Sequence, residues 1–360
     1  MKKLFWGIIA VFPFYLSFAQ TVVYQDASVF PLCGKAVEET SARYQRFPSS
    51  LKETARPALW RLSENSAGLY VRFRSDAPSI HARWTTRAHR MPHMTDAGVS
   101  GLDLYALVDG KWHFAGSGFV WGEAGKSRER KLVGNMEPQM REYMLYLPLY
   151  DCLDSLFIGT PEGYALEQPV LDSPRRSRPV VMYGTSILQG GCASRAGMAH
   201  TAILSRWLDR EVINLGFSGN AHLDTEVAQL IASVEDPSVI VLDYVPNCTA
   251  KLIEDKGLGF FRIVRDAHPD VPVVFVENPE YTHSVLDLKI AGEIKAKNDA
   301  QRALYESLRK AGEKKLYYVK GKGMTGDDGE AAVDGVHFTD LGMMRYARHL
   351  YPVLKKLIGK

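Results

Sequence analysis

The hydrophobic pattern of this chain changes its period between residues 163 and 179, and this change limits the folds open to it. From about residue 22 to residue 163, apolar residues mostly recur at every second position, as in half-buried strands. After residue 179, short apolar runs alternate with longer segments of helical spacing. Period-two runs without long helices favour an antiparallel sandwich, and alternating strands and helices favour a parallel sheet covered on both faces. We therefore predict an N-terminal β-sandwich followed by a three-layer α/β/α domain with a flavodoxin-like parallel sheet.

The length of 360 residues suggests about two domains. The sandwich is expected over residues 20–165 and the α/β domain over residues 179–360. The segment between them, 166–178, is rich in proline and charge and has no period, so it is interpreted as a linker. Within the sandwich, the sequence "LDLYALVDGKWHFAG" predicts two strands joined at Asp109-Gly110, a strong hairpin signal.

The first residues, 1–19, are predicted to be a secretory signal and not part of the fold. Two lysines precede an apolar stretch, and small residues at Ser17 and Ala19 predict cleavage after Ala19. A membrane anchor is the alternative, but the apolar stretch is short for a span, and no later segment is long and apolar enough. The protein is therefore expected to be periplasmic or secreted, with no membrane span in the mature chain.

Residues suited to hydrolytic chemistry follow the first three strands of the α/β domain and precede its last helix. Ser186 follows the first strand, Gly219 the second and Asn247 the third, and Asp334 and His337 share a later loop. The carboxyl ends of parallel strands meet at one edge of the sheet, where ligands bind. A serine nucleophile needs a base, an orienting carboxylate and donors for the oxyanion. Each residue also has a plainer explanation as a turn residue or a helix cap.

The order of these residues resembles that of the SGNH (GDSL-type) hydrolases, which are named after a serine, a glycine, an asparagine and a histidine. The similarity covers about residues 179–360. It implies that Ser186 is the nucleophile, with His337 as general base and Asp334 as its orienting carboxylate. It also implies an oxyanion hole made of the backbone N–H groups of Ser186 and Gly219 and the side chain of Asn247.

Two positions depart from the family pattern. Thr185 stands where an aspartate often precedes the serine, and Val245 stands where a glycine often lies two residues before the asparagine. Val245 is expected to narrow the pocket. The G-x-S-x-G elbow of the α/β-hydrolases is absent around Ser186, which argues against that other fold.

The front half has a resemblance of its own. The segment "GVSGLDLYAL", residues 98–107, is similar to the G-x-D-L-Y segment of an all-β domain found ahead of certain SGNH hydrolases. The connection before it is long for a compact sandwich, and such loops are often functional. We expect residues 88–94 to reach over the catalytic mouth, with His89, Arg90, His93 and Met94 lining the pocket. A mobile surface loop is the alternative.

The resemblance and the predicted export together imply an exported serine esterase acting on small acyl esters, with a carbohydrate O-acetylesterase favoured. The expected substrate is a small-molecule or oligosaccharide ester. A lipid esterase (lysophospholipase) or thioesterase of the same fold is one alternative, and a carbohydrate-binding protein with decayed catalysis is another. The intact set of catalytic residue types argues against decay.

No cofactor and no metal are expected, because the other histidines lack metal-ligand spacing. The net charge of +3 argues against a nucleic-acid partner, which usually requires a strong basic stripe. Protein partners and the oligomeric state stay open.

A disulfide is predicted between Cys192 and Cys248. Cys192 follows the first strand of the α/β domain and Cys248 follows the third. In a sheet ordered 2-1-3 these strands are neighbours, about 4.8 Å apart, and export favours oxidation. Two free buried thiols are the alternative. No pairing is predicted for Cys33 and Cys152.

Overall fold

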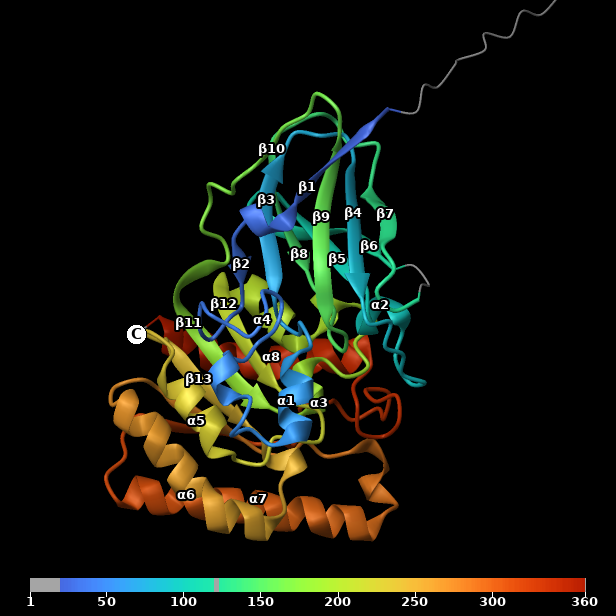
Figure 1. The fold of residues 1–360 in the computed structure, drawn as a ribbon. Coiled ribbons are helices and arrows are strands. Elements are labelled where there is room, and N and C mark those ends of the chain that lie inside the picture. The colour runs from blue at the N-terminus through green and yellow to red at the C-terminus, as the bar shows by residue number, and fades with distance from the viewer. Residues whose placement is uncertain (1–19, 120–122, 360) are drawn as a thin grey trace, which may run out of the picture.

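Two antiparallel sheets occupy the front half of the chain, and a parallel sheet flanked by helices occupies the rest (Figure 1). The computed structural model describes residues 20–119 and 123–359, so the predicted signal segment lies outside the described residues. The fold class expected from the sequence is confirmed. Within the described ranges, no helix has the length and apolar character needed to cross a membrane.

The strands β1 to β10 of the front half form two antiparallel sheets. One has the order β1-β9-β4-β7, and the other has the order β10-β3-β8-β5-β6 with β2 beside β3. The turn at Asp109-Gly110 joins β5 to β6 with positive φ values of 49° and 72°, as a tight hairpin turn requires. The strands are β1 (Val22–Asp26), β2 (Leu32–Cys33), β3 (Tyr70–Ser75), β4 (Ile80–Thr86), β5 (Leu102–Val108), β6 (Lys111–Gly118), β7 (Arg128–Val133), β8 (Arg141–Tyr146), β9 (Leu153–Pro161) and β10 (Leu166–Glu167).

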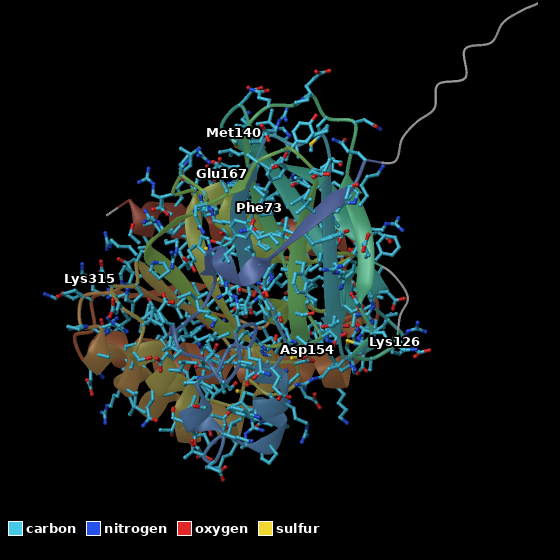
Figure 2. The ribbon with its side chains drawn as sticks, turned by 45° about the horizontal axis from the view of Figure 1, so that its top comes forward. Phe73, Lys126, Met140, Asp154, Glu167 and Lys315 are labelled. Carbon is cyan, nitrogen blue, oxygen red and sulfur yellow. The ribbon has the colours of Figure 1, made fainter. Side chains whose placement is uncertain are left out.

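The sheet that contains β3 and β8 is covered on both faces. Phe73 stacks on Tyr143 inside the sandwich, with ring centroids 5.2 Å apart, whereas Met140 lies at an outer end (Figure 2). On the other face of the same sheet, Tyr70 and Tyr146 belong to a core shared with the α/β domain. The sandwich is therefore packed directly onto the α/β domain.

The parallel sheet has the order β12-β11-β13-β14-β15, a flavodoxin-like arrangement. Its strands are β11 (Arg175–Gly184), β12 (Arg210–Gly216), β13 (Val239–Asp243), β14 (Val273–Val276) and β15 (Leu316–Val319). Side chains of β11 such as Val180, Val181 and Met182 are buried, as expected for a strand with helices on both faces.

Helices cover both faces of this sheet. α4 and α8 pack together on one face, and α5, α6 and α7 lie on the other, with α6 and α7 side by side (Figure 1). Thr339 begins α8 by accepting a 3.2 Å hydrogen bond from the backbone N–H of Gly342, a normal N-cap. The α-helices are α1 (Pro57–Ser63), α2 (Asp96–Val99), α3 (Ser186–Gln189), α4 (His200–Leu208), α5 (Thr225–Ala232), α6 (Ala250–Ala267), α7 (Leu288–Lys310) and α8 (Asp340–Ile358). The 3-10 turns are η1 (Ala27–Val29), η2 (Ser49–Leu51), η3 (Ala196–Met198), η4 (Val245–Asn247) and η5 (Thr282–Val285).

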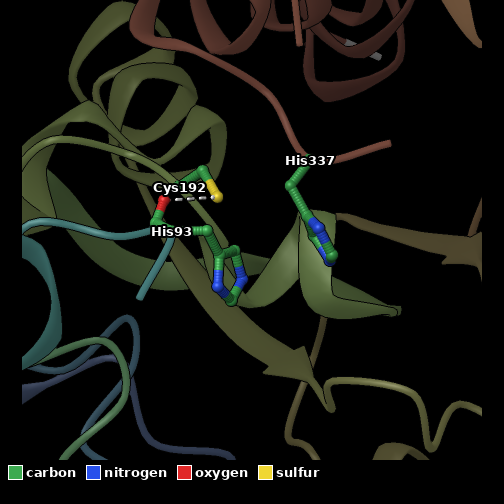
Figure 3. Close-up of side chains that lie close together, drawn as sticks. All are labelled: His93, Cys192 and His337. Carbon is green, nitrogen blue, oxygen red and sulfur yellow. Dashed lines mark hydrogen bonds between the residues drawn. The ribbon is translucent and has the colours of Figure 1, made fainter. Parts of the chain in front are cut away.

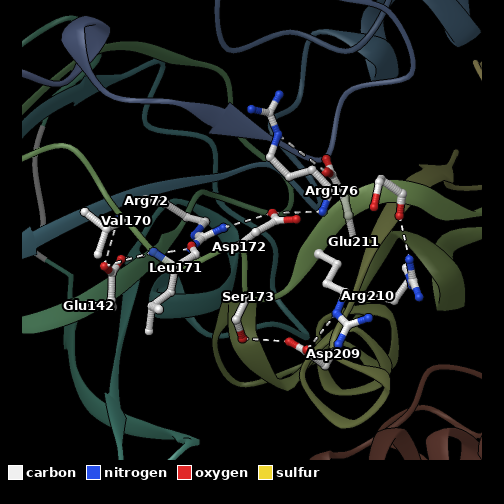
Figure 4. Close-up of polar contacts among 12 residues, drawn as sticks. Arg72, Glu142, Val170, Leu171, Asp172, Ser173, Arg176, Asp209, Arg210 and Glu211 are labelled. Atoms are coloured by element: carbon white, nitrogen blue, oxygen red, sulfur yellow. Dashed lines mark hydrogen bonds and ion pairs between the residues drawn. The ribbon is translucent and has the colours of Figure 1, made fainter.

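The segment expected to be a linker is tied to both halves. Its first two residues form β10, which pairs with β3, and β11 already begins at Arg175. Between them, the backbone N–H of Val170 donates to the Glu142 carboxylate at 2.8 Å, and the Ser173 hydroxyl donates to Asp209 at 2.6 Å (Figure 4). The connection is therefore a fixed part of the interface between the halves.

Candidate active site

Ser186 is the first residue of α3, at the carboxyl end of β11. The Thr185 side chain caps this helix by accepting a 3.3 Å hydrogen bond from the backbone N–H of Ile187. Gly190 follows the helix as its C-cap, with a φ of 110° that favours glycine. The backbone N–H groups of Gly190 and Gly191 both donate to the Ser186 carbonyl, at 3.1 and 2.7 Å. A tight turn thus holds Ser186 at the sheet edge with its side chain 6% exposed.

Ser186, His337 and Asp334 form a continuous hydrogen-bonded chain. Ser186 Oγ lies 2.8 Å from His337 Nε2, and His337 Nδ1 lies 2.7 Å from Asp334 Oδ2. The other oxygen of Asp334 accepts the backbone N–H groups of Val336 and His337, at 3.0 and 2.8 Å. When His337 Nδ1 donates to Asp334, Nε2 is the acceptor that faces the Ser186 hydroxyl.

The carboxyl group of Asp334 stays ionised. Partial burial alone would raise its pKa, but the hydrogen bonds from the His337 backbone, the His337 ring and the Val336 backbone outweigh burial and lower the pKa to about 2. A charged carboxylate at this position both orients the imidazole and stabilises its protonated form.

The loops after β12 and β13 bring the expected oxyanion donors to the same edge. Gly219 has a φ of 65°, and the space where a Cβ would stand is open. Asn247 ends η4, and its amide oxygen accepts the backbone N–H of Ala221 at 3.2 Å, which leaves the amide NH₂ as the donor for a ligand. In the described part of the chain, neither the Gly219 N–H nor the Asn247 NH₂ donates to a protein acceptor.

Val245 does not narrow the pocket as expected. Its side chain is fully buried and belongs to the core that packs under α5 and α6. Val245 is the first residue of η4, which follows β13 after Tyr244.

The Gln189 side chain links the turn that holds Ser186 to the loop that contains Gly219. Gln189, the last residue of α3, accepts the backbone N–H of Ser218 at 2.9 Å and donates to the carbonyl of Leu149 at 3.0 Å. Gln189 is fully buried, so these bonds are shielded from water.

Arg56 holds the same loop from the front half of the chain. Its guanidinium donates to both carboxylate oxygens of Asp224, at 2.7 and 2.9 Å, and to the Asn220 side chain at 2.9 Å. A bidentate arginine–carboxylate pair fixes orientation as well as distance. The position of Gly219 therefore depends on a residue more than 150 positions earlier in the chain.

Comparisons with known proteins show the family to which both halves of the chain belong. Residues 177–355 match the GDSL-like lipase/acylhydrolase family, and residues 22–166 match the N-terminal GxDLY domain of SGNH-hydrolase-type esterases. A GDSL-like lipase from Bacteroides ovatus is 36% identical, with 94% of this chain and 98% of that chain covered and a TM-score of 0.89. The chain belongs to the GDSL-like lipase/acylhydrolase family. It is accordingly a serine hydrolase that acts on carboxylic ester bonds.

More distant structures share the fold of this GDSL-like hydrolase. A salicylyl-acyltransferase from a tetracycline biosynthetic pathway is 18% identical, with 92% of this chain and 95% of that chain covered and a TM-score of 0.72. A family two carbohydrate esterase from Clostridium thermocellum, solved in complex with cellohexaose, is 13% identical, with 94% and 99% covered and a TM-score of 0.57. No curated protein matches the chain.

The G-x-D-L-Y segment of this GDSL-like hydrolase joins its two halves. Asp103 Oδ2 accepts hydrogen bonds from the Arg195 guanidinium and the Gly197 backbone N–H, each at 2.7 Å, and the Tyr105 hydroxyl accepts from Arg195 at 2.6 Å. A Cβ on Gly197 would lie 2.4 Å from the Tyr105 ring, so only glycine fits there. Burial raises the pKa of Asp103, while Arg195 and Gly197 oppose that rise. The motif thus anchors the loop that follows α3.

The loop of residues 88–94 lies beside the loop that carries His337. The His93 ring centroid is 5.5 Å from that of His337, and His89 lines a groove beside the Gly219 loop. Arg90 is exposed and does not line this groove. Met94 was expected at the pocket, but it is buried in the shared core because it lies directly under the start of α2.

The groove has a volume of about 510 Å³ and is built by both halves of the chain. Most of its polar lining comes from the front half, including Arg61, Glu64, Asn65 and Arg87, and the catalytic half contributes Ser218 and Asn220. Tyr150 also lines it, and the hydroxyl of Tyr150 donates to the Ser186 carbonyl at 3.1 Å. Tyr150 therefore connects this groove to the backbone of Ser186. Its full lining is Ala58, Arg61, Leu62, Glu64, Asn65, Arg87, His89, Met91, Tyr150, Asp151, Cys152, Ser218 and Asn220.

The predicted disulfide between Cys192 and Cys248 is wrong, and all four cysteines are free, buried thiols. Cys192 Sγ donates to the His93 carbonyl at 3.3 Å, whereas Cys248 Sγ donates to the Ala221 carbonyl at 3.3 Å. Neighbouring strands do meet at the edge as expected. However, the chain after α3 turns toward the front domain, while Cys248 points into the core on the other face of the sheet.

Cys192 instead lies with two histidines. One ligand atom from each of His93, Cys192 and His337 can be chosen so that all three lie within 4.8 Å of one another (Figure 3). Sequence spacing did not reveal this cluster, because its members come from three distant segments. Burial raises the pKa of Cys192 to about 12, and the charge of Asp334 adds to the rise, so the thiol is neutral.

Proposed function

We propose that this hydrolase is an exported carbohydrate O-acetylesterase that uses Ser186, His337 and Asp334 as its catalytic triad. The observation that carries the proposal is the 2.8 Å contact between Ser186 Oγ and His337 Nε2. A polar groove built by both domains lies beside this contact, since its lining residue Tyr150 donates to the Ser186 carbonyl. Such a contact is the arrangement that activates a serine for acyl transfer.

The reaction then follows from the geometry. Ser186 Oγ attacks the ester carbonyl as His337 Nε2 takes its proton, and Asp334 stabilises the resulting imidazolium. The oxyanion is met by the N–H groups of Ser186 and Gly219 and by the Asn247 amide, each worth on the order of 3 kcal/mol by analogy with other oxyanion holes. His337 returns the proton to the leaving alcohol. Water, deprotonated by His337, releases the acyl group as a carboxylic acid.

The groove favours a carbohydrate as the alcohol part of the ester. Arg61, Glu64, Asn65 and Arg87 offer donors and acceptors at its surface, which suits sugar hydroxyl groups. A carbohydrate esterase of the same fold, the Clostridium thermocellum protein, was solved with cellohexaose bound. Export, which rests on the signal predicted in residues 1–19, would place the enzyme where polysaccharides occur.

A lipid esterase is the second candidate, and one surface feature favours it. Val285, Leu286 and Leu288 are 76%, 85% and 79% exposed, which is unusual for three large apolar side chains so close in sequence. His283 of the same segment packs on Gly335, between Asp334 and His337. This apolar group therefore lies near the catalytic loop, where a lipid surface would need it.

One experiment separates the two candidates. The mature chain is assayed with p-nitrophenyl esters from acetate to palmitate and, in parallel, with acetylated cello- and xylo-oligosaccharides. We expect kcat/KM to be highest for acetate, to fall with acyl length, and to be higher for acetylated oligosaccharides than for p-nitrophenyl acetate. A maximum at long acyl chains would favour the lipid esterase. Export is tested separately, by sequencing the N-terminus of the extracytoplasmic protein, which should begin at Gln20.

A further inference from the structure

Three soft or borderline metal ligands meet beside the nucleophile. His93 comes from the loop between β4 and β5, Cys192 from the loop after α3, and His337 from the loop before α8. Their ligand atoms lie within 4.8 Å of one another, and the Cys192 residue is 7% exposed (Figure 3). The proposed esterase reaction uses only His337 of these three.

The donor set suits a particular kind of ion. One thiolate and two imidazoles are ligands that Zn²⁺ takes in tetrahedral geometry, with Zn–S near 2.3 Å and Zn–N near 2.0–2.1 Å. Around one such ion the ligand atoms are separated by about 3.4–3.6 Å. Side-chain rotations that bring these ligand atoms about 1 Å closer together would therefore place them at three corners of a tetrahedron around one ion.

The surroundings of His337 also fit a metal ligand. Asp334 Oδ2 lies 2.7 Å from Nδ1, which is the carboxylate–histidine pairing that orients imidazoles toward metals. Nε2 is then the nitrogen that His337 can offer, and it now lies 2.8 Å from Ser186 Oγ. A metal ion and the serine proton therefore compete for the same lone pair.

We infer that His93, Cys192 and His337 bind one Zn²⁺ ion, with water as the fourth ligand, and that the bound ion blocks hydrolysis by occupying Nε2 of His337. Binding breaks the hydrogen bond from Cys192 Sγ to the His93 carbonyl and releases the thiol proton to solvent, because the thiolate is the ligand. This inference goes beyond the proposed function, since it assigns an inhibitory metal site and not a catalytic one.

Binding is measured on the full, metal-free chain by calorimetry with Zn²⁺, in buffers of different ionisation enthalpy. We expect one ion per chain and the release of about one proton. With Co²⁺ as the probe, we expect the near-ultraviolet charge-transfer band of a cobalt–thiolate bond. Ser186→Ala should still bind Zn²⁺, so the binding test does not depend on esterase activity. Absence of binding would overturn the inference.

The variants decide which residues hold the ion. Cys192→Ser and His93→Ala should each weaken Zn²⁺ binding by at least about tenfold. The matched controls Cys248→Ser and His89→Ala should bind Zn²⁺ like the parent, because Cys248 and His89 lie outside the cluster. If the controls lost binding as strongly, or if Cys192→Ser and His93→Ala kept it, the assignment would be wrong.

Inhibition is measured with p-nitrophenyl acetate at buffered Zn²⁺ concentrations. Parent activity should fall with the occupancy found by calorimetry and return when EDTA is added. The concentration for half-inhibition, taken relative to each variant's own zinc-free rate, should rise at least about tenfold in Cys192→Ser. Zinc that binds at the site without slowing hydrolysis would refute the inhibitory part.

Discussion

The hydroxyl of Tyr150 donates a 3.1 Å hydrogen bond to the carbonyl oxygen of Ser186. Tyr150 lies between β8 and β9 of the front domain and is buried. A side chain of the sandwich therefore contacts the backbone of the residue proposed as the nucleophile. The front domain is therefore part of the structure that surrounds Ser186.

Tyr150→Phe tests this contact. The Ser186 carbonyl would keep its bonds from the Gly190 and Gly191 N–H groups, so the protein should fold. The loss of one hydrogen bond, about 1 kcal/mol, should lower kcat about fivefold with little change in KM. Tyr146→Phe is the matched control, because its hydroxyl donates to the Ala202 carbonyl at 3.4 Å and not to the nucleophile. Equal kcat values for parent and Tyr150→Phe would show that the contact does not position Ser186.

Ser186→Ala should abolish ester hydrolysis. Without the hydroxyl no acyl-enzyme forms, and the rate should fall by on the order of 10³-fold or more. The side chain is small, and Ser186 Oγ bonds only to His337 among the described residues, so the thermal midpoint should change little. Burst kinetics and a serine-reactive phosphonate give independent readouts, and phosphonate labelling should disappear with activity. Retained activity in a pure, folded preparation would contradict the assignment.

Asp334→Asn should lower kcat strongly while leaving KM similar. The amide removes the charge that stabilises protonated His337 and can hold the wrong tautomer, an effect near 10⁴-fold in other serine hydrolases. The pKa of Asp334 is lowered from 3.8 to about 2, so the carboxylate stabilises the fold above pH 3.8 and this stabilisation is lost as the pH falls toward 2. Acid unfolding of the parent should therefore be steeper than that of the variant between pH 4 and 2. A decrease of less than tenfold in kcat would mean that another group orients His337.

The sequence was sufficient to predict the parts of the structure that depend on local pattern. The apolar run before Ser186 predicts a buried parallel strand, and Asp109-Gly110 predicts a hairpin. In β3, Tyr70 and Arg72 alternate with Val71 and Phe73, a pattern typical of a strand with one exposed face, yet Tyr70 and Arg72 are both buried. Alternation of apolar and polar residues shows that the two faces of a strand differ, but it does not show that a second domain covers the polar face.

Contacts between distant segments could not be predicted. Nothing beside Arg56 or Tyr150 in the sequence marks them as neighbours of the catalytic loops, because only the packing of the two domains brings them there. The disulfide prediction failed for a related reason. The strand order correctly predicts that Cys192 and Cys248 lie at the same edge of the sheet. It does not predict the directions of their side chains, which pack on opposite faces of that sheet.

Arg56→Ala tests the brace on the Gly219 loop. The variant removes the bidentate bond to Asp224 and the bond to Asn220, so the loop should lose its fixed position. Because Arg56 is partly exposed, we expect a modest effect, with kcat lowered about three- to tenfold. Arg74→Ala, which breaks an exposed arginine–glutamate pair with Glu167 in the sandwich, is the control and should keep full activity. Equal activity in the two variants would show that Arg56 does not support catalysis.

Glu211 makes the stability of the protein depend on pH. It lies at the start of β12, where it accepts the backbone N–H of Gly34 and lies 3.9 Å from Arg176 (Figure 4). Burial raises its pKa from 4.5 to about 7, against the opposing effects of Gly34 and Arg176. Between these two pH values the folded state holds a proton that the unfolded state has lost. The contribution of Glu211 is therefore fully favourable below pH 4.5 and declines as the pH rises to about 7.

Glu211→Gln should remove this dependence. The amide oxygen can still accept the Gly34 N–H, but the side chain no longer titrates. The parent should lose up to about 3 kcal/mol more stability than Glu211→Gln between pH 4.5 and 7.5, the value of a shift of this size in a buried group. Glu38→Gln is the matched control, because Glu38 lies 3.7 Å from the same Arg176 but is exposed, and it should follow the parent. Urea unfolding at several pH values gives the comparison, and parallel curves for the parent and Glu211→Gln would show that Glu211 is ionised in the folded protein throughout this range.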